Sequence, residues 1–175
     1  RLPVRRLIGV FNRCHYDDVL AVRVHPEYLK TQKLPRRISL KKRWRERYES
    51  IVAFERHLAR NGYLILKFFL HVSRKEQARR FRRRIDRPHK NWKFSDADLK
   101  ERVLWDEYQD AYEKALNATS RSWAPWYAVP ADDKPFMRAT VARIVEASLA
   151  SLELEYPHVG EDRVQELQEL RGRIE

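Results

Sequence analysis

Three short apolar runs, separated by helical patterns, divide the first part of the chain. Residues 7–11 (LIGVF) are apolar and predict a buried strand, with polar residues from Asn12 onward at its carboxyl end. Residues 63–72 are apolar and aromatic and predict a second, fully buried strand; residues 126–129 predict a third that ends at Pro130. Strands that alternate with helices indicate the α/β class, with a parallel sheet flanked by helices.

A periodic stripe predicts a long helix over residues 40–60. Its apolar positions recur at intervals of three and four residues, as one buried helical face requires: Trp44, Tyr48, Ile51, Phe54 and Leu58. Asn61 and Gly62 follow directly, and this pair predicts the end of the helix.

Capping signals predict where the later helices begin. Ser73 and Glu76 form a capping box, so a helix is expected to begin there and to end before Pro88. Ser95 is a second cap, and it predicts one long helix that runs to about Ala118. The positions of that helix expected to face inward are Leu99, Val103, Trp105, Tyr108, Ala111, Tyr112 and Ala115.

The length of 175 residues corresponds to one domain. We assign residues 1–157 to this domain, with a further helix over 136–154, and residues 158–175 to a short amphipathic tail helix. Apolar residues make up 43% of the chain, which is enough for a core and excludes wholesale disorder. The single cysteine excludes a disulfide framework and a cysteine-based zinc site. No apolar run reaches the roughly 18 residues of a membrane span.

The amino-terminal residues show no secretory signal, and the sequence does not begin with Met. We therefore expect the true start of the protein to lie outside this sequence. The four glycines, Gly9, Gly62, Gly160 and Gly172, are too far apart for a glycine-rich phosphate loop. Any phosphate that this chain holds is therefore not bound by a glycine loop of its own.

The formal net charge of +12 is concentrated in two segments. Residues 36–47 carry a balance of +6 and residues 73–93 one of +8, so the rest of the chain is close to neutral. Concentrated positive charge attracts polyanions. Nucleic acid, an anionic membrane surface and inorganic polyphosphate fit this pattern equally, and a solvated helical face is the alternative without a ligand.

The second basic segment carries a stripe of arginines. Arg79, Arg80, Arg83 and Arg84 recur at helical spacing and share one side of the predicted helix, and Arg87 lies one turn further on. Like charges at this spacing destabilise a helix, so the stripe indicates an anionic partner. A basic and aromatic turn (Lys90, Trp92, Lys93) follows, and together these features predict a helical lid over about residues 73–95 that clamps phosphate.

Two polar segments follow predicted strands, where open parallel sheets bind their ligands. In the first, Asp17 and Asp18 could hold Mg²⁺ and Arg13 could brace a phosphoryl oxygen; a polar helix start is the alternative. In the second, Asp133 and Lys134 either begin a helix or contact a nucleotide. The residues alone leave both choices open.

Many short motifs, in order, resemble the family-2 polyphosphate kinases, which move phosphoryl groups between inorganic polyphosphate and nucleotides. The matching stretches cover nearly the whole chain: 9–20, 54–58, 65–71, 76–77, 80–81, 91–95, 98–102, 123–127 and 129–134. Cys14 replaces the Ser of the family pattern and Asp17 replaces Glu, and both are mild changes.

The resemblance implies a P-loop kinase-like fold and a Mg²⁺-dependent, cytoplasmic and oligomeric enzyme. The implied reaction converts ADP or AMP with polyphosphate to ATP or ADP, without membrane or nucleic-acid partners. Asn12 and Arg13 occupy the Walker B position and are the implied catalytic residues, with Asp17 and Asp18 at the metal. The expected substrate-binding residues are Lys75, Arg79, Arg80, Arg83, Lys90 and Lys93 in the lid, and Asp133 and Lys134 after the third strand.

The Walker A loop of the family precedes these motifs, and the sequence begins after it. We therefore expect this chain alone to be inactive or nearly so. We also expect strand 7–11 and the strand around Leu66 either to pair directly or to receive a strand from another chain, because open apolar edges aggregate. A nucleic-acid-binding module and a non-catalytic partner subunit are the alternative functions.

Overall fold

A computed structural model describes residues 2–4, 7–12, 14–34, 38–152, 154–156 and 158–174. The chain divides into two compact units, Arg1–Arg138 and Ala139–Glu175. The first unit contains the sheet, and the second contains most of α6 (Lys134–Ala150) and α7 (Glu161–Arg171).

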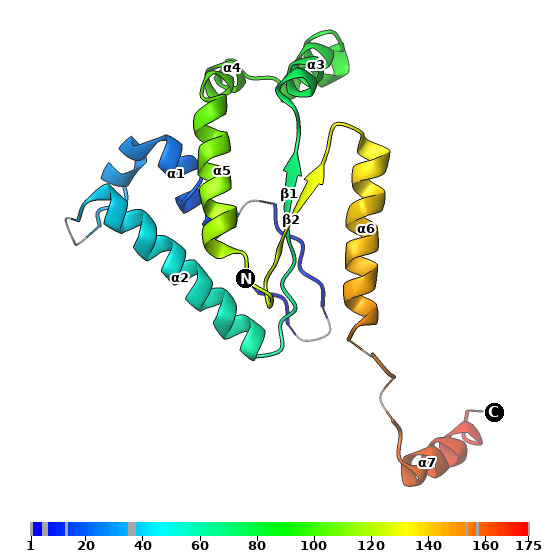
Figure 1. Ribbon diagram of the computed structural model, residues 1–175. Coiled ribbons are helices and arrows are strands. Elements are labelled where there is room, and N and C mark those ends of the chain that lie inside the picture. Colours follow the sequence, from blue (N-terminus) through cyan, green and yellow to red (C-terminus); the bar gives the residue numbers. More distant parts are fainter. Residues whose placement is uncertain are drawn as a thin grey trace. The chain divides into compact units, whose positions relative to one another are not determined.

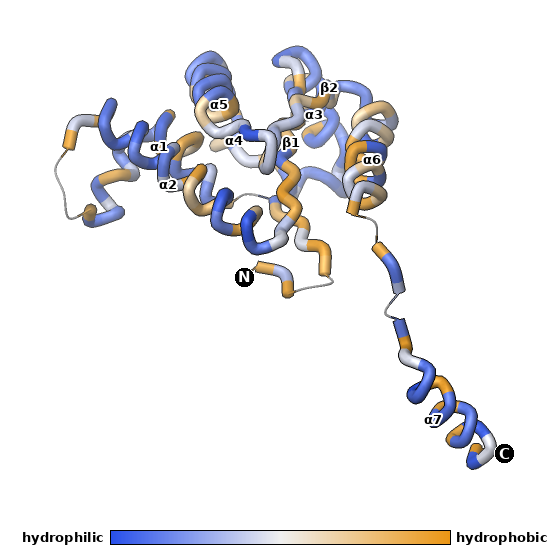
Figure 2. The backbone as a smooth tube through the Cα atoms, turned by 60° about the horizontal axis from the view of Figure 1, so that its bottom comes forward, coloured by the Kyte–Doolittle hydropathy of each residue, from blue (hydrophilic) through white to orange (hydrophobic). Residues whose placement is uncertain are grey.

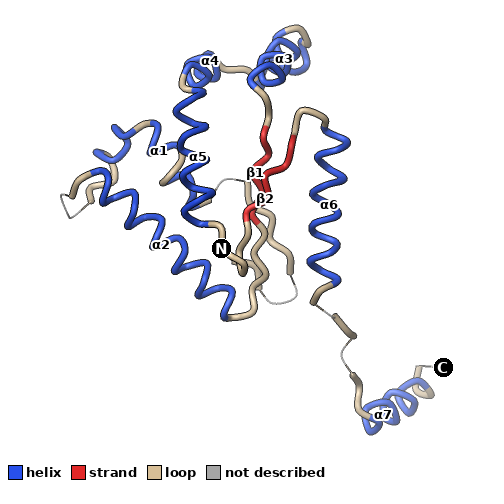
Figure 3. Tube along the Cα trace, in the orientation of Figure 1, coloured by secondary structure: helices blue, strands red, loops and turns tan. Residues whose placement is uncertain are grey.

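Two parallel strands form the sheet of the described residues. β1 (Lys67–His71) pairs with β2 (Trp126–Pro130) in a register that places Lys67 beside Trp126 (Figure 3). The parallel pairing confirms the α/β class, and β2 ends at Pro130 as predicted. Because both strands run in the same direction, the segments that follow them lie at the same edge of the sheet.

The helix α2 (Leu40–Arg60) has the bounds that the apolar stripe predicts. Ser39 caps its start, and Gly62 follows its end with φ +84°, a conformation that glycine adopts at little cost. The predicted core positions Trp44, Ile51 and Leu58 are buried. Phe54, in contrast, is 44% exposed, and Glu55 takes the buried position beside it.

The core of the first unit lies between α2, α5 (Trp105–Thr119) and the short helical segments η1 (His15–Asp18) and α1 (Ala21–Val24) (Figure 1). A third short segment, η2 (Pro26–Lys30), follows α1 and has no buried residue. The buried cluster of this core contains residues from each side of the layer: Tyr16, Val19, Leu20, Ile51, Ala111 and Ala115. The α5 face also contacts the sheet, since the rings of Tyr112 and Phe69 lie 4.5 Å apart.

The cap signals are confirmed at both predicted helix starts. Ser73 caps α3 (Arg74–Ile85), which ends before Pro88, and Ser95 caps α4 (Asp96–Val103). The single long helix predicted from Ser95 is wrong, because the backbone leaves the helical conformation at Leu104 and α5 begins anew.

The break at Leu104 also changes which side chains are buried. Figure 1 shows α4 crossing the end of α5, so the inward face of α5 is not continued in α4. Ala111 and Ala115 of α5 are buried as predicted, whereas Leu99 and Val103 of α4 are 50% and 74% exposed. Between α3 and α4 lies the short helix η3 (Pro88–Lys93).

One strand prediction is wrong, and a second is confirmed only in part. Residues 7–11 form no strand, and Val10 is 91% exposed. Residues 63–72 form a strand only over β1, whose Leu70 is 44% exposed rather than fully buried. A strand needs neighbours on its hydrogen-bonding edges and cover on both faces, and within the described residues β1 has only β2 beside it.

The expected direct pairing between segment 7–11 and the strand around Leu66 is also absent from the described residues. The supply of a strand by another chain stays a prediction.

In the second unit, α7 is a short helix from Glu161 to Arg171 between Gly160 and Gly172. Hydrophobic and hydrophilic positions alternate along it, and all of its residues are exposed (Figure 2). No helix among the described residues of the chain is long and apolar enough to cross a membrane.

Candidate functional site

The loops that follow β1 and β2 are joined at the carboxyl edge of the sheet. Ser73 ends the first loop, and its hydroxyl accepts a hydrogen bond from the Glu76 amide at 3.1 Å, which caps α3. The Ser73 amide donates to a carboxylate oxygen of Asp132 at 2.7 Å. The start of the arginine-rich helix is therefore fixed to the loop after β2.

Glu76 and Arg80 strengthen this connection. Hydrogen bonds from Arg79 (2.9 Å) and Arg80 (2.8 Å), in that order of effect, lower the pKa of the buried Glu76 carboxyl to about 2. Arg80 also donates to the carbonyl oxygens of Ala131 (2.5 Å) and Asp132 (3.3 Å). The Arg80 guanidinium thus bonds to Glu76 within α3 and to two carbonyl groups of the loop after β2, and so connects α3 to that loop.

Positive charge collects around Lys134 at the start of α6. The pKa of Lys134 is lowered from its usual value, first by Arg80, then by partial burial, and then by three further cations. We call this group the cationic cluster: Arg80, Arg83, Lys90, Lys134 and Arg138. Like charges held this close repel each other, so an anion bound among them would be stabilised.

The structure thus brings four of the predicted substrate-binding residues into one cluster from α3, η3 and α6. It adds Arg138, which the sequence analysis missed. The spacing of Lys134 and Arg138, i and i+4 on one helix, was the signal that could have found it.

The other predicted lid cations lie outside this cluster. Arg79 bonds to Glu76, and the Lys93 ammonium lies 4.8 Å from the centre of the exposed Trp92 ring. Lys75 is exposed on α3. Asp133 accepts a hydrogen bond from the Phe136 amide at 2.8 Å, so its carboxylate acts at the start of α6, as the helix-start alternative describes.

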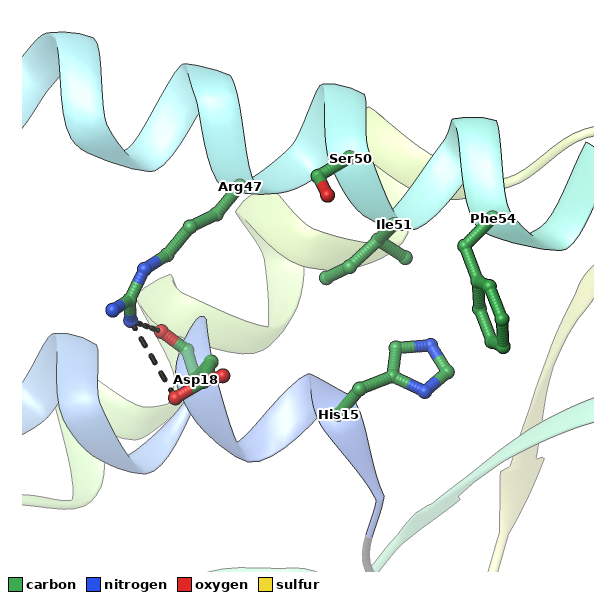
Figure 4. A pocket seen from close by; sticks show the side chains of 6 residues that line it. All are labelled: His15, Asp18, Arg47, Ser50, Ile51 and Phe54. Carbon is green, nitrogen blue, oxygen red and sulfur yellow. Dashed lines mark hydrogen bonds and ion pairs between the residues drawn. The ribbon is translucent and has the colours of Figure 1, made fainter. Parts of the chain in front are cut away.

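The predicted catalytic segment is only partly described. Arg13 lies outside the described residues, and Asn12 is exposed, directly after a segment that forms no strand. The next residues form η1, which contacts α2 across a pocket of about 300 Å³ (Figure 4). Figure 4 shows His15 and Phe54 at one end of this pocket and Asp18 with Arg47 at the other.

Asp17 and Asp18, the predicted Mg²⁺ ligands, are the last two residues of η1. The Asp18 carboxylate accepts a hydrogen bond from Gln32 at 3.0 Å and lies 3.7 Å from Arg47. No group of three His, Cys, Asp or Glu residues that could hold a metal occurs in the part of the chain that the structure describes. Two carboxylates suffice for Mg²⁺ only where phosphate and water oxygens complete its shell. The pair therefore fits a metal that arrives with phosphate, and this role stays a prediction.

Behind η1 lies a buried polar network that the sequence analysis missed. The Lys67 ammonium donates to Glu55 (2.6 Å), to the Tyr16 hydroxyl (3.0 Å) and to the Thr119 carbonyl (3.0 Å). The Tyr16 hydroxyl donates to the other Glu55 oxygen at 2.9 Å. The network therefore joins η1, α2, β1 and the end of α5.

In this network, burial and ion pairing shift the pKa values of Glu55 and Lys67 in opposite directions. Burial raises the pKa of Tyr16 well above its usual value. Burial alone would also raise the pKa of Glu55, but the His15 ring, 3.8 Å away, and the hydrogen bond from Lys67 outweigh it and keep this pKa below its usual value. Burial lowers the pKa of Lys67, and Glu55 opposes that shift. The signal in the sequence was a charged residue within each of two apolar patterns.

Comparison with known proteins agrees with this architecture. The family model of Polyphosphate kinase 2 (PPK2) matches residues 1–157. The chain superposes on the crystal structure of Polyphosphate Kinase 2 from Arthrobacter aurescens TC1 with a TM-score of 0.86 and 36% identity. This superposition covers 98% of the chain and 56% of that structure.

Two curated relatives are similar over most of the chain. The ADP-polyphosphate phosphotransferase of Rhodopseudomonas palustris is 50% identical, across 99% of this chain and 60% of the relative. The AMP/ADP-polyphosphate phosphotransferase of Meiothermus ruber is 43% identical, across 90% of this chain and 55% of the relative. The chain thus spans between half and two thirds of the length of these relatives, and it belongs to the polyphosphate kinase 2 family.

Proposed function

We propose that this chain is the phosphate-binding part of a phosphotransferase. The enzyme moves phosphoryl groups between inorganic polyphosphate and a nucleoside mono- or diphosphate. The family and the activities named for the two relatives support this proposal. The observation that carries it is the cationic cluster, because five cations from three helical segments converge beside the ends of both strands.

Within this proposal the cations divide into two roles. Arg83, Lys90, Lys134 and Arg138 bind phosphate oxygens, since the repulsion among the cations of the cluster favours a bound anion. Arg80 is a positioning residue, because its guanidinium bonds to Glu76 and to two carbonyl groups. Lys75, Arg79 and Lys93 contact more distant parts of the phosphate chain when the lid closes.

Phosphoryl transfer depends mainly on the positioning of its reactants and on the neutralisation of their charge. We propose that Asn12 and Arg13 act at the transferred group, and that Asp17 and Asp18 hold a divalent metal, Mg²⁺, which would neutralise phosphate charge. Asp133 orients the first turn of α6 and thereby Lys134, which contacts the donor or acceptor phosphate.

The decisive experiment is a competition between anions for the cationic cluster. We expect a polyphosphate of defined length to bind this chain more tightly than sulfate at equal ionic strength, and ADP to add to that affinity. The double variant Arg83→Gln/Lys134→Gln should lose at least about tenfold in polyphosphate affinity, as expected for two charge-assisted contacts. Equal affinity for polyphosphate and sulfate would refute the proposal.

A single-stranded oligonucleotide serves as a second competitor, because Trp92 is 78% exposed and could stack on a base. We expect Trp92→Ala to leave polyphosphate binding unchanged. Oligonucleotide binding that is tighter than polyphosphate binding, and that Trp92→Ala removes, would favour the nucleic-acid-binding alternative instead.

A further inference from the structure

A second positively charged surface lies in the first unit, away from the lid. It is a groove of about 640 Å³ between α2 and the carboxyl end of α5. Its charged lining consists of four arginines, one histidine and one acid: Arg45, Arg56, Arg60, Arg121, His57 and Glu49.

This groove and the cationic cluster lie at opposite ends of the sheet. The lid helix α3 begins directly after the carboxyl end of β1, whereas Arg121 precedes the amino end of β2, which starts at Trp126. Figure 1 shows α3 and α4 beyond one end of the strands and the carboxyl ends of α2 and α5 near the other. The two surfaces are therefore separate sites.

Two of the groove's guanidinium groups are held in place before any ligand arrives. Arg56 lies over the ring of Trp123, at 4.9 Å from its centre. Arg121 donates to the carbonyl oxygens of Ser120 (2.6 Å) and Ala118 (3.1 Å). A guanidinium that is already ordered loses less conformational entropy when it binds an anion.

The positive charge of the groove is largely unneutralised. Glu49 is the one carboxylate among the described residues that line it, and it lies 3.7 Å from Arg45. Arg56 and Arg60 are i and i+4 on α2, a spacing at which like charges repel. A bound anion would remove this repulsion.

We propose that this groove is a second binding site, for a ligand that carries two or more linked phosphate groups. The arginines bind the phosphate oxygens, and the apolar strip formed by Tyr48, Val52 and Ala53 takes the uncharged part of the ligand where it has one. Condensed phosphate and a nucleoside diphosphate share this chemistry. The proposal uses no lid residue, so it holds or fails independently of the proposed function.

Calorimetric titration of the chain with tripolyphosphate, and separately with ADP, tests this site. We expect Arg56→Gln/Arg60→Gln to lose one class of tripolyphosphate or ADP sites, or to weaken it about tenfold or more, while the class that Arg83→Gln/Lys134→Gln removes persists. Loss of tripolyphosphate binding alone identifies the ligand as condensed phosphate, and loss of ADP binding alone identifies a nucleotide.

The matched control is Lys41→Gln/Lys42→Gln, which removes the same charge from α2 outside the groove and should keep both classes of sites. Hydrogen exchange should show ligand-dependent protection at residues 118–121 in the parent chain and none in the groove variant. The proposal is overturned if the groove variant binds both ligands as the parent does, or if the control variant loses as much affinity.

Discussion

Lys67 and Glu55 form a buried ion pair, with 8% and 3% of their surfaces exposed. Replacing Glu55 by Gln would leave the Lys67 ammonium without a counter-charge in the core. Removal of one partner from a buried pair costs about 3–5 kcal/mol of stability. We therefore predict that urea denaturation of Glu55→Gln shows a loss of this size, whereas Glu49→Gln, at an exposed α2 position, changes the stability by less than about 0.5 kcal/mol.

The double variant Glu55→Leu/Lys67→Met separates pairing from packing. It removes both charges together, so it should be less destabilised than Glu55→Gln. If the double variant unfolds at the same urea concentration as Glu55→Gln, or at a lower one, charge compensation between Glu55 and Lys67 is not what stabilises this part of the core.

His25 supplies a second residue-scale prediction, which concerns pH. Its ring nitrogens lie 3.0 Å from Glu101 of α4 and 3.1 Å from Glu27. The hydrogen bond to Glu101, followed by the one to Glu27, raises the pKa of His25 above its usual 6.5. A raised histidine pKa means that the protonated ring stabilises the fold below pH 6.5, and that this contribution disappears as the pH rises through the higher folded value.

Tm measurements between pH 6 and 9 test whether the contribution of His25 to stability falls as the pH rises. We predict that the parent chain loses Tm across this range relative to His25→Gln, which cannot titrate. Hydrogen bonds from Tyr108 and His25 lower the pKa of Glu101. The contact between His25 and Glu101 therefore also weakens at strongly acid pH, where the Glu101 carboxylate becomes protonated. Parallel pH profiles for the two chains would show that His25 does not bind α4 in this way.

At the scale of elements, a variant can separate the hydrogen bonds by which Arg80 holds α3 in place from the positive charge of Arg80. Arg80→Lys keeps the charge but cannot reach Glu76 and the Ala131 carbonyl together, because lysine is a point donor rather than a planar fork. We predict a loss of about 1–2 kcal/mol of stability and a weaker affinity for polyphosphate. Arg83→Gln should weaken polyphosphate binding without a comparable loss of stability.

Paired urea and calorimetric titrations of these two variants make the comparison. Unchanged stability in Arg80→Lys together with a normal polyphosphate affinity would show that Arg80 contributes only charge.

The elements also show what local sequence could and could not predict. The caps at Ser73 and Ser95 and the end of α2 at Gly62 were predictable because each depends on hydrogen bonds or backbone angles within a few residues. Segment 7–11 was misassigned because a strand depends on partners that lie elsewhere in the fold. The break at Leu104 escaped notice because the apolar spacing continues through it.

For the candidate site, the sequence predicted a stripe of arginines on one helix but not which protein groups each arginine contacts. Arg80 and Arg83 belong to the same helical stripe, so periodicity alone assigned them the same role. The Ala131 carbonyl, which accepts a hydrogen bond from Arg80, lies some fifty positions further along the chain. Only the fold brings this carbonyl and the Arg80 guanidinium together. Glu55 and Lys67 were likewise paired only by the fold.

At the scale of the whole molecule, the net charge of +12 opposes the association of exposed apolar surface. Leu7, Ile8, Val10 and Phe11 are 63%, 71%, 91% and 59% exposed. Charge repulsion between copies is screened by salt, since the Debye length falls from about 30 Å at 0.01 M to about 3 Å at 1 M, while apolar association is not screened.

We predict that light scattering of the isolated chain rises with salt, and that Val10→Thr/Phe11→Ser reduces this rise. Val103→Thr, a substitution at a 74% exposed position of α4, should not. If both variants scatter like the parent at every salt concentration, the association arises at another surface, and segment 7–11 does not drive it.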